Sequence, residues 1–85
     1  MNVLIPSALR SYTESSHAQA SGATLAELLL DLDRQYPGIR FRMIDEQHNV
    51  RRHIRIFING EQEMDLARAL KSSDEVVIVQ ALSGG

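Results

Sequence analysis

The chain has 85 residues and a net charge of −2, with 44% hydrophobic and 24% charged residues, which suits one small soluble domain and not two. The absence of cysteine excludes disulfides, thiolate metal sites and a cysteine nucleophile, and the slightly acidic balance disfavours nucleic acid as the main partner. No apolar run approaches the ~18 residues of a membrane span and the first residues lack a signal-peptide core, so we expect a cytoplasmic protein with no membrane partner.

The N-terminal segment predicts a short β-hairpin. Val3 to Ile5 form a strand candidate that Pro6 and Ser7 end. Residues 8–16 are polar and turn-like, and residues 17–21 are a weak candidate for the returning strand.

The main helix is predicted from Thr24 to Tyr36. Its apolar side chains recur with a 3.6-residue period and form one stripe, made of Leu25, Leu28, Leu29, Leu32 and Tyr36. Thr24 and Glu27 have the spacing of a capping box, and Pro37-Gly38 ends the helix. A short second helical turn is expected at residues 39–44, burying Ile39 or Phe41 with Met43 or Ile44.

A hairpin is predicted in the second half of the chain. Residues 53–58 alternate, which places Ile54, Ile56 and Ile58 on one face. Asn59-Gly60 follows at once and is a strong turn signal, because both residues tolerate a positive φ. Residues 61–64 are the expected returning arm.

The last part of the domain predicts a short turn of helix at residues 66–70, a loop at residues 71–74 and a final strand at residues 75–80. In that strand Val76 and Ile78 face one way, and Val77 and Val79 face the other.

This order of elements predicts the α+β class. One helix with one apolar stripe, and a sheet that needs one face covered, fit the β-grasp or ubiquitin-like arrangement, in which a mixed sheet of four to five strands packs on one main helix. The ferredoxin-like fold is the alternative, but it needs a second long helix, and residues 66–70 are too short for one. We expect a β-grasp domain over residues 1–80 and a flexible C-terminal tail over residues 81–85.

The chain ends in Ser83-Gly84-Gly85, shortly after the last predicted strand. A glycine pair has no Cβ atoms, so it can pass through a narrow channel and bring the terminal carboxylate close to another protein. On the tail alone, a frayed end is an equally good interpretation.

Six short motifs follow one another along nearly the whole chain: Val3-Leu4-Ile5-Pro6, Ala23-Thr24-Leu25, Tyr36-Pro37-Gly38, Ile58-Asn59-Gly60-Glu61, Asp74-Glu75-Val76 and Gly84-Gly85. In this order they resemble the ThiS/MoaD family of ubiquitin-like sulfur carrier proteins. Residues 3–13 and the long stretch 43–52 look closest to the carriers that feed cysteine biosynthesis or related thiolation. Residues 81–83 depart from the family's commoner lead-in of small residues, which leaves the choice of partner enzyme open.

The resemblance implies a carrier and not an enzyme. The carboxylate of Gly85 would accept the sulfur; because it is an anion at neutral pH and a poor electrophile, it needs adenylation by ATP before a sulfur donor can displace AMP and leave a thiocarboxylate. The chain has no Gly-rich phosphate loop with a lysine, so the ATP would be used by a separate enzyme and no cofactor would be permanently bound. The implied partners are a ubiquitin-activating-like adenylyltransferase, a persulfide or sulfurtransferase as sulfur donor, and an acceptor enzyme that makes cysteine, thiazole, molybdopterin or a secondary metabolite.

Two surfaces are candidates for binding these partners. Phe57, Val77 and Val79 are predicted to form an exposed apolar patch on the open sheet face, and the resemblance supports docking there together with the tail. Five of the nine basic residues lie within 16 positions, and they form either a solvated loop or a basic patch that steers an acidic partner: Arg40, Arg42, Arg51, Arg52 and Arg55. RNA binding fits poorly, because only two nearby aromatic rings are available for stacking.

Two alternative functions are kept. A ubiquitin-like modifier or interaction module would use the same tail and sheet face, and an isopeptide bond from Gly85 to lysines of other proteins would favour it. A stand-alone enzyme has no residue constellation in its favour. The three histidines are scattered and predict no metal site, and Asp31 and Asp33 diverge on the helix.

Overall fold

The computed structural model describes residues 1–81 of the chain. The elements are β1 (Asn2–Leu4), the 3-10 turn η1 (Ser7–Leu9), α1 (Arg10–Thr13), β2 (His17–Gln19), α2 (Leu25–Gln35), α3 (Ile39–Met43), β3 (Ile54–Ile58), β4 (Glu61–Gln62) and β5 (Val76–Gln80). The predicted order of two strands, a long helix, a strand, a short strand and a final strand is confirmed.

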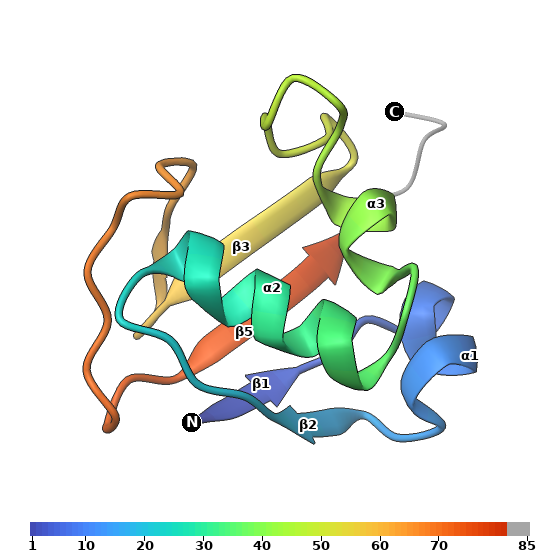
Figure 1. Cartoon of the computed structure of the whole chain (residues 1–85), viewed down its shortest axis with the longest axis horizontal. Helices are drawn as coiled ribbons and strands as arrows, with labels where there is room; N and C mark the ends of the chain where they lie inside the picture. The colour runs from blue at the N-terminus through green and yellow to red at the C-terminus, as the bar shows by residue number, and fades with distance from the viewer. Residues whose placement is uncertain (82–85) are drawn as a thin grey trace.

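The strands form one five-stranded mixed sheet in the order β2-β1-β5-β3-β4 (Figure 1). The first and last strands lie side by side and parallel at its centre, and the other pairs are antiparallel. In the β3–β5 ladder Ile56 lies opposite Ile78 and Ile58 lies opposite Val76, so the buried side chains of both strands point to one face.

Helix α2 covers that buried face together with α3 (Figure 1). Thr24 caps α2, since its hydroxyl oxygen accepts the N–H of Glu27 at 3.3 Å. The predicted stripe is confirmed: its four leucines are fully buried, and Tyr36 at the end of α2 packs on the core half-buried. Burial of these leucines against the isoleucines of β3 and β5 makes the hydrophobic core.

The Asn59-Gly60 turn is confirmed by its backbone, with φ values of +52° and +86°. The side chain of Asn59 also ties the turn to the start of β5. Its amide nitrogen donates to Asp74 Oδ1 at 2.8 Å, and its amide oxygen accepts the N–H of Glu75 at 2.9 Å. The hairpin and the start of the last strand are therefore held together at one end of the sheet.

The prediction of a helical turn at residues 66–70 is wrong. Residues 66 and 67 form an isolated turn, closed by the N–H of Arg68 donating to the carbonyl oxygen of Asp65 at 3.1 Å, and no helix follows. The carbonyl oxygens of Leu66 and Arg68 instead accept the N–H groups of Ala26 and Leu25 at the start of α2, at 2.9 and 3.0 Å. The first N–H groups of a helix have no partner within the helix. The carbonyl oxygens of this segment satisfy those N–H groups, and the chain continues past Arg68 into a bridge between Ala69 and Thr24 instead of a helix.

One smaller expectation also needs correction, and another is confirmed. Residues 8–16 are not only a polar turn: they contain η1 and α1, anchored by the buried side chains of Leu9 and Thr13. In α3 the buried residues are Ile39 and Met43, followed by Ile44, whereas Phe41 is 58% exposed.

Candidate functional site

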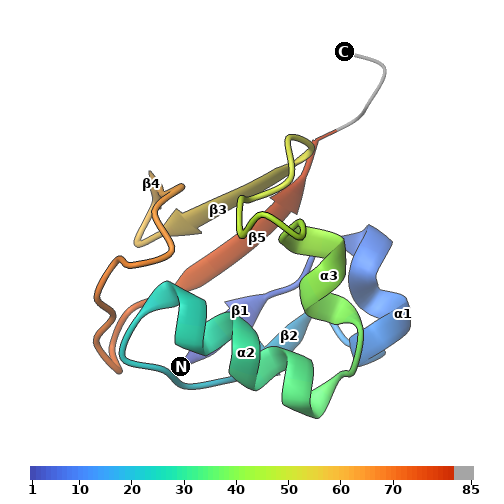
Figure 2. The same ribbon diagram turned by 45° about the horizontal axis from the view of Figure 1, so that its top comes forward.

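Figure 2 shows α2 and α3 on one face of the sheet. The residues of the predicted docking patch belong to the opposite face. Phe57 on β3 lies opposite Val77 on β5, and Arg55 lies opposite Val79. Their sequence neighbours point into the core, so these side chains point to the other face. The parallel pairing of β1 with β5 places Leu4 beside Val77. The patch therefore runs from Leu4 through Val77 to Phe57 across three adjacent strands, with Val79 beside it.

The patch is less exposed than the sequence predicts. Val79 is 40% exposed, whereas Phe57 and Val77 are half-buried. Each lies on a central strand, where side chains of the two neighbouring strands shield it. Sequence reasoning missed Leu4; the alternation around the buried Val3 was a usable signal, but no local pattern reveals that β1 pairs with β5.

The described chain ends at Ala81, beside the start of β3. The N–H of Ala81 donates to the carbonyl oxygen of His53 at 2.7 Å, which continues the β3–β5 ladder by one residue. Ser83, Gly84 and Gly85, the predicted tail and sulfur-accepting residues, lie outside the described residues. They are joined to the sheet at the end where β3 begins and β5 finishes.

Basic side chains gather at this same end of the sheet. Arg51 and Arg52 lie shortly before β3 and Arg55 belongs to it, while Arg42 of α3 lines a cleft together with residues 53 and 80. Arg40 lies apart, because it lines a different cleft beside the 44–50 loop. The structure thus brings four of the five clustered arginines to the end from which the tail departs.

The paired carboxylates of α2 serve structural contacts. Asp31 accepts the backbone N–H of Ser21 and pairs with Arg34 at 2.6 Å, and these contacts hold the pKa of Asp31 below its usual value. Asp33 accepts two backbone N–H groups at the start of α3. The two carboxylates therefore do not converge on a reactive point, as the sequence predicts.

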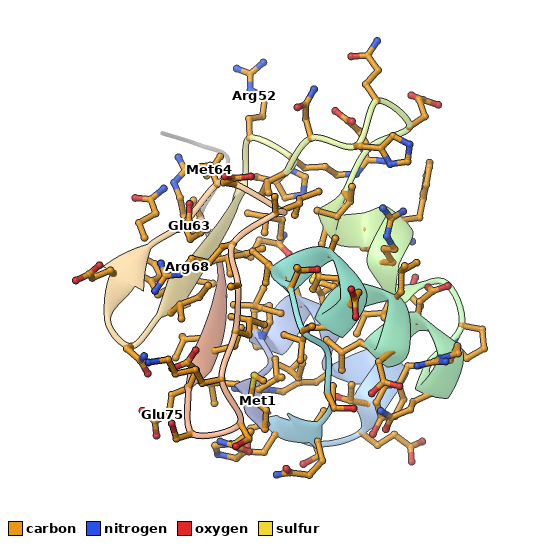
Figure 3. All side chains as sticks on the ribbon, turned by 60° about the vertical axis from the view of Figure 1, so that its left-hand side comes forward. Met1, Arg52, Glu63, Met64, Arg68 and Glu75 are labelled. Carbon is orange, nitrogen blue, oxygen red and sulfur yellow. The ribbon has the colours of Figure 1, made fainter. Side chains whose placement is uncertain are left out.

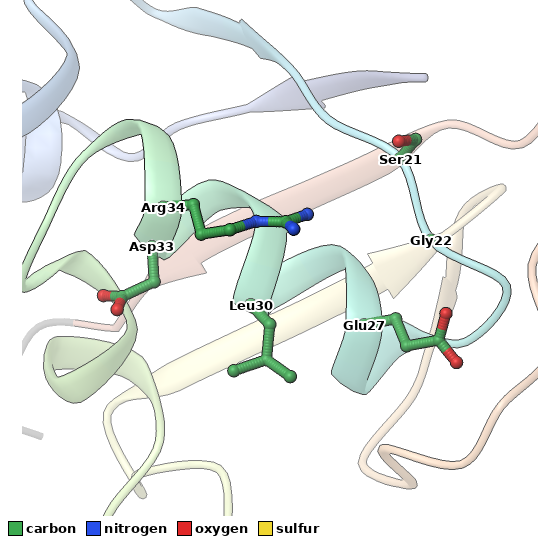
Figure 4. A pocket seen from close by; sticks show the side chains of 6 residues that line it. All are labelled: Ser21, Gly22, Glu27, Leu30, Asp33 and Arg34. Carbon is green, nitrogen blue, oxygen red and sulfur yellow. The ribbon is translucent and has the colours of Figure 1, made fainter.

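A shallow pocket on the outer side of α2 is lined by Asp33, Leu30 and Glu27, which lie in a row along it (Figure 4). Glu27 accepts the N–H of Ala23, the residue before the cap, at 3.3 Å, so its carboxylate reaches one residue beyond the N–H that a capping box uses, while Thr24 caps the helix. The polar groups of this pocket stabilise helix ends.

The histidines do not form a site with other ligands. His17 lies on β2 beside Asn2, His48 lies in the 44–50 loop and His53 precedes β3. Within residues 1–81 no group of three histidine, aspartate or glutamate side chains is placed to hold a metal ion.

In a comparison of the sequence with protein families, the ThiS family matches residues 3–85, which is nearly the whole chain and includes the terminal glycine pair. The chain belongs to the ThiS family. It is 34% identical to the sulfur carrier protein CysO of Mycobacterium tuberculosis, over all of this chain and 98% of that protein. The predicted resemblance to carriers of the cysteine type is thereby confirmed.

Solved structures agree with this assignment. A chain of the Amycolatopsis orientalis BexX/CysO complex superimposes with a TM-score of 0.89 at 31% identity, covering 99% of this chain and 98% of that one. The small archaeal modifier protein SAMP1 of Haloferax volcanii superimposes with a TM-score of 0.80 at 25% identity, covering 100% and 98%. The predicted β-grasp fold is confirmed.

This ThiS-family chain is a sulfur carrier protein, and it is a small carrier rather than a catalyst. Along residues 1–81, no helix is both long and apolar enough to cross a bilayer.

Proposed function

We propose that the terminal carboxylate of Gly85 carries the sulfur as a thiocarboxylate and that this sulfur serves cysteine biosynthesis. The observation that supports this most is the full-length match to the CysO sulfur carriers, together with a family match that extends to the last glycine. We also infer that the protein works in the cytoplasm, because a chain without cysteine needs no oxidising compartment.

The chemistry requires activation by a separate enzyme of the ubiquitin-activating type. A carboxylate oxygen of Gly85 attacks the α-phosphorus of ATP, and pyrophosphate leaves, which gives an acyl-adenylate. The terminal sulfur of a persulfide donor then attacks the acyl carbon and AMP leaves. A thiol then attacks the donor sulfur of the resulting acyl disulfide, so the thiocarboxylate remains on Gly85 and the donor leaves as a mixed disulfide with that thiol. ATP is thus a co-substrate of the partner, and the carrier itself holds no cofactor.

The glycine pair suits this role because neither residue has a Cβ atom. A tail that enters a narrow active site is crowded by any side chain, and only glycine adopts positive φ freely. Gly84 is therefore as important as Gly85, although only Gly85 undergoes chemistry. Ser83 would mark the junction with the rest of the tail.

The apolar patch of Leu4, Phe57, Val77 and Val79 is the surface that we propose docks on the adenylating enzyme. Apolar side chains that share an open sheet face are a common protein-binding surface. Val79 of the patch lies on β5, two residues before Ala81, so one partner can contact the sheet and the tail at once. The CysO of Amycolatopsis orientalis crystallised as a complex with BexX, which shows that a related carrier forms a stable complex with another protein.

Intact mass spectrometry tests the proposal. The purified chain is incubated with ATP, its adenylating enzyme and a persulfide donor, and the expected product has one oxygen replaced by sulfur at Gly85. Deletion of Gly85, or Gly84→Val, should abolish loading while the circular dichroism spectrum stays unchanged, because a terminal segment adds little stability. Full loading of the truncated chain, or sulfur on any other residue, contradicts the proposal.

A ubiquitin-like modifier is the second candidate, favoured by the structural similarity to the small archaeal modifier protein SAMP1. It predicts an isopeptide bond between Gly85 and lysines of other proteins. Immunoblots of cell extracts against the tagged chain distinguish the two functions, since a carrier gives one low-mass band and a modifier gives many larger ones.

A further inference from the structure

The arginines at the tail end of the sheet are held by neutral groups. Arg42 Nε donates to the Tyr12 hydroxyl at 2.9 Å, and Arg51 Nε donates to the carbonyl oxygen of Phe41 at 2.8 Å. The guanidinium of Arg51 also lies over the Phe41 ring, 4.6 Å from its centroid. Among residues 1–81 the ion pairs are Arg34–Asp31 and Arg68–Glu63, so neither Arg42 nor Arg51 forms an ion pair with a carboxylate of the described chain, although Arg51 lies close enough to Asp45 to help lower the pKa of that carboxyl.

These contacts leave the terminal nitrogens of two oriented guanidinium groups available at one cleft. The cleft has a volume of about 200 Å³ and is lined by Phe41, Arg42, Arg51 and His53. A second cleft of about 290 Å³ adjoins it, shares Arg42 and His53, and reaches Gln80 at the end of β5. We call the pair of clefts the basic cleft. Because a guanidinium that is already oriented loses little entropy on binding, such a site suits a carboxylate.

Charge is segregated along the sheet. The basic cleft lies where β3 begins and β5 ends, whereas the opposite end of these two strands carries Glu61, Asp74 and Glu75, with Arg68 and Lys71 near them. Figure 3 shows Arg52 and Glu75 at opposite ends of the molecule. A protein with a net charge of −2 thus presents a positive end, and an approaching acidic surface meets that end first.

The basic cleft is continuous with the start of the tail, because Ala81 is bonded to His53, which lines both clefts. A segment of four residues spans at most about 14 Å. An enzyme that acts on Gly85 must therefore cover this end of the sheet.

We propose that the basic cleft binds carboxylate side chains on an acidic surface of the adenylating enzyme and so directs the tail end of the carrier into that enzyme. This inference rests on the proposed function. An acidic protein surface is favoured over nucleic acid because the opposite end of the molecule is acidic and because the exposed ring of Phe41 is already covered on one face by Arg51.

Charge reversal tests the inference. The assay is pyrophosphate exchange by the ubiquitin-activating-like enzyme encoded in the same genome, with the carrier as varied substrate. Arg42→Glu and Arg51→Glu should each raise the KM for the carrier at least about tenfold with kcat nearly unchanged, because like charges then face each other. Lys71→Glu makes the same change of charge on an exposed loop near the acidic end and should change KM less than about twofold.

Two further variants distinguish recognition by an oriented guanidinium group from attraction by positive charge alone. Arg42→Lys keeps the charge but loses the planar fork, and Tyr12→Phe removes only the hydroxyl that holds Arg42. Both should raise KM by about threefold, less than charge reversal does. The KM of the native carrier should rise between about 50 and 500 mM salt, and that of Arg51→Glu should rise much less.

The controls keep this inference separate from the proposed function. The Gly85 deletion should be inactive in the same assay; if it is fully active, the proposed function is wrong. If exchange depends on Gly85 but Arg42→Glu and Arg51→Glu match Lys71→Glu, the inference alone is overturned. It is equally overturned if the variants raise the KM for ATP instead of that for the carrier, or if an oligouridylate competes with the enzyme for the native carrier. Thermal melts confirm that each variant is folded, and Arg51→Gln replaces Arg51→Glu if the latter is not.

Discussion

The strongest test of the structure compares two neighbouring residues of β3 that point to opposite faces. Ile56 is 0% exposed and lies opposite Ile78 in the core, whereas Phe57 is half-buried on the open face. Ile56→Ala should destabilise the domain by about 2–5 kcal/mol, because it removes three buried carbons and leaves a cavity. Phe57→Ala should cost only about 1–2 kcal/mol, mostly the contact with its cross-strand neighbour. Removal of the larger side chain, Phe57, is thus expected to lower the free energy of unfolding less than removal of Ile56.

The measurement is urea unfolding followed by circular dichroism, with the free energy of unfolding extrapolated to water. A domain of this size has a total stability of about 4–13 kcal/mol, so Ile56→Ala removes a large part of it. Binding to the adenylating enzyme should show the reverse order, with Phe57→Ala weakening the complex and leaving the fold intact. A loss of stability at Phe57 that equals or exceeds the loss at Ile56 means that the strand faces are assigned the wrong way round.

Three further predictions concern local structure. Thr24→Ala should lower the free energy of unfolding by about 1 kcal/mol while Thr24→Ser changes it little, because the N-cap hydroxyl is lost only in the first. Gly22→Ala should cost roughly 1–3 kcal/mol in the same urea assay, since a Cβ there would lie 2.4 Å from the backbone nitrogen of Leu28. The pKa of Asp74 is held below its usual value, mainly by the hydrogen bond from the N–H of Lys71 and then by the one from Asn59. The ionised carboxylate of Asp74 therefore stabilises the fold at neutral pH, and this stabilisation is lost as the pH falls below about 4. Asp74→Asn should therefore be less stable than the native chain at pH 7 and equally stable near pH 2, and a constant difference across that range contradicts the contact.

Local signals predicted the elements that depend on short-range physics. The period of the leucines, the cap at Thr24 and the positive φ values at Asn59-Gly60 all act within a few residues, and the structure confirms each. Residues 66–70 were mispredicted because their backbone partners are the first N–H groups of α2, about 40 residues earlier in the chain.

The sequence by itself determined the family, the fold class, the core face of each central strand and the position of the glycine pair, because these follow from periodicity and from motifs in order. Only the tertiary structure decided that β1 pairs with β5 and adds Leu4 to the apolar patch. It also separated Arg40 from the basic cleft and gave Arg42 and Arg51 their neutral partners. The physical reason is that strand pairing and side-chain clusters join residues far apart in the chain, and their contacts are set by how the whole core packs.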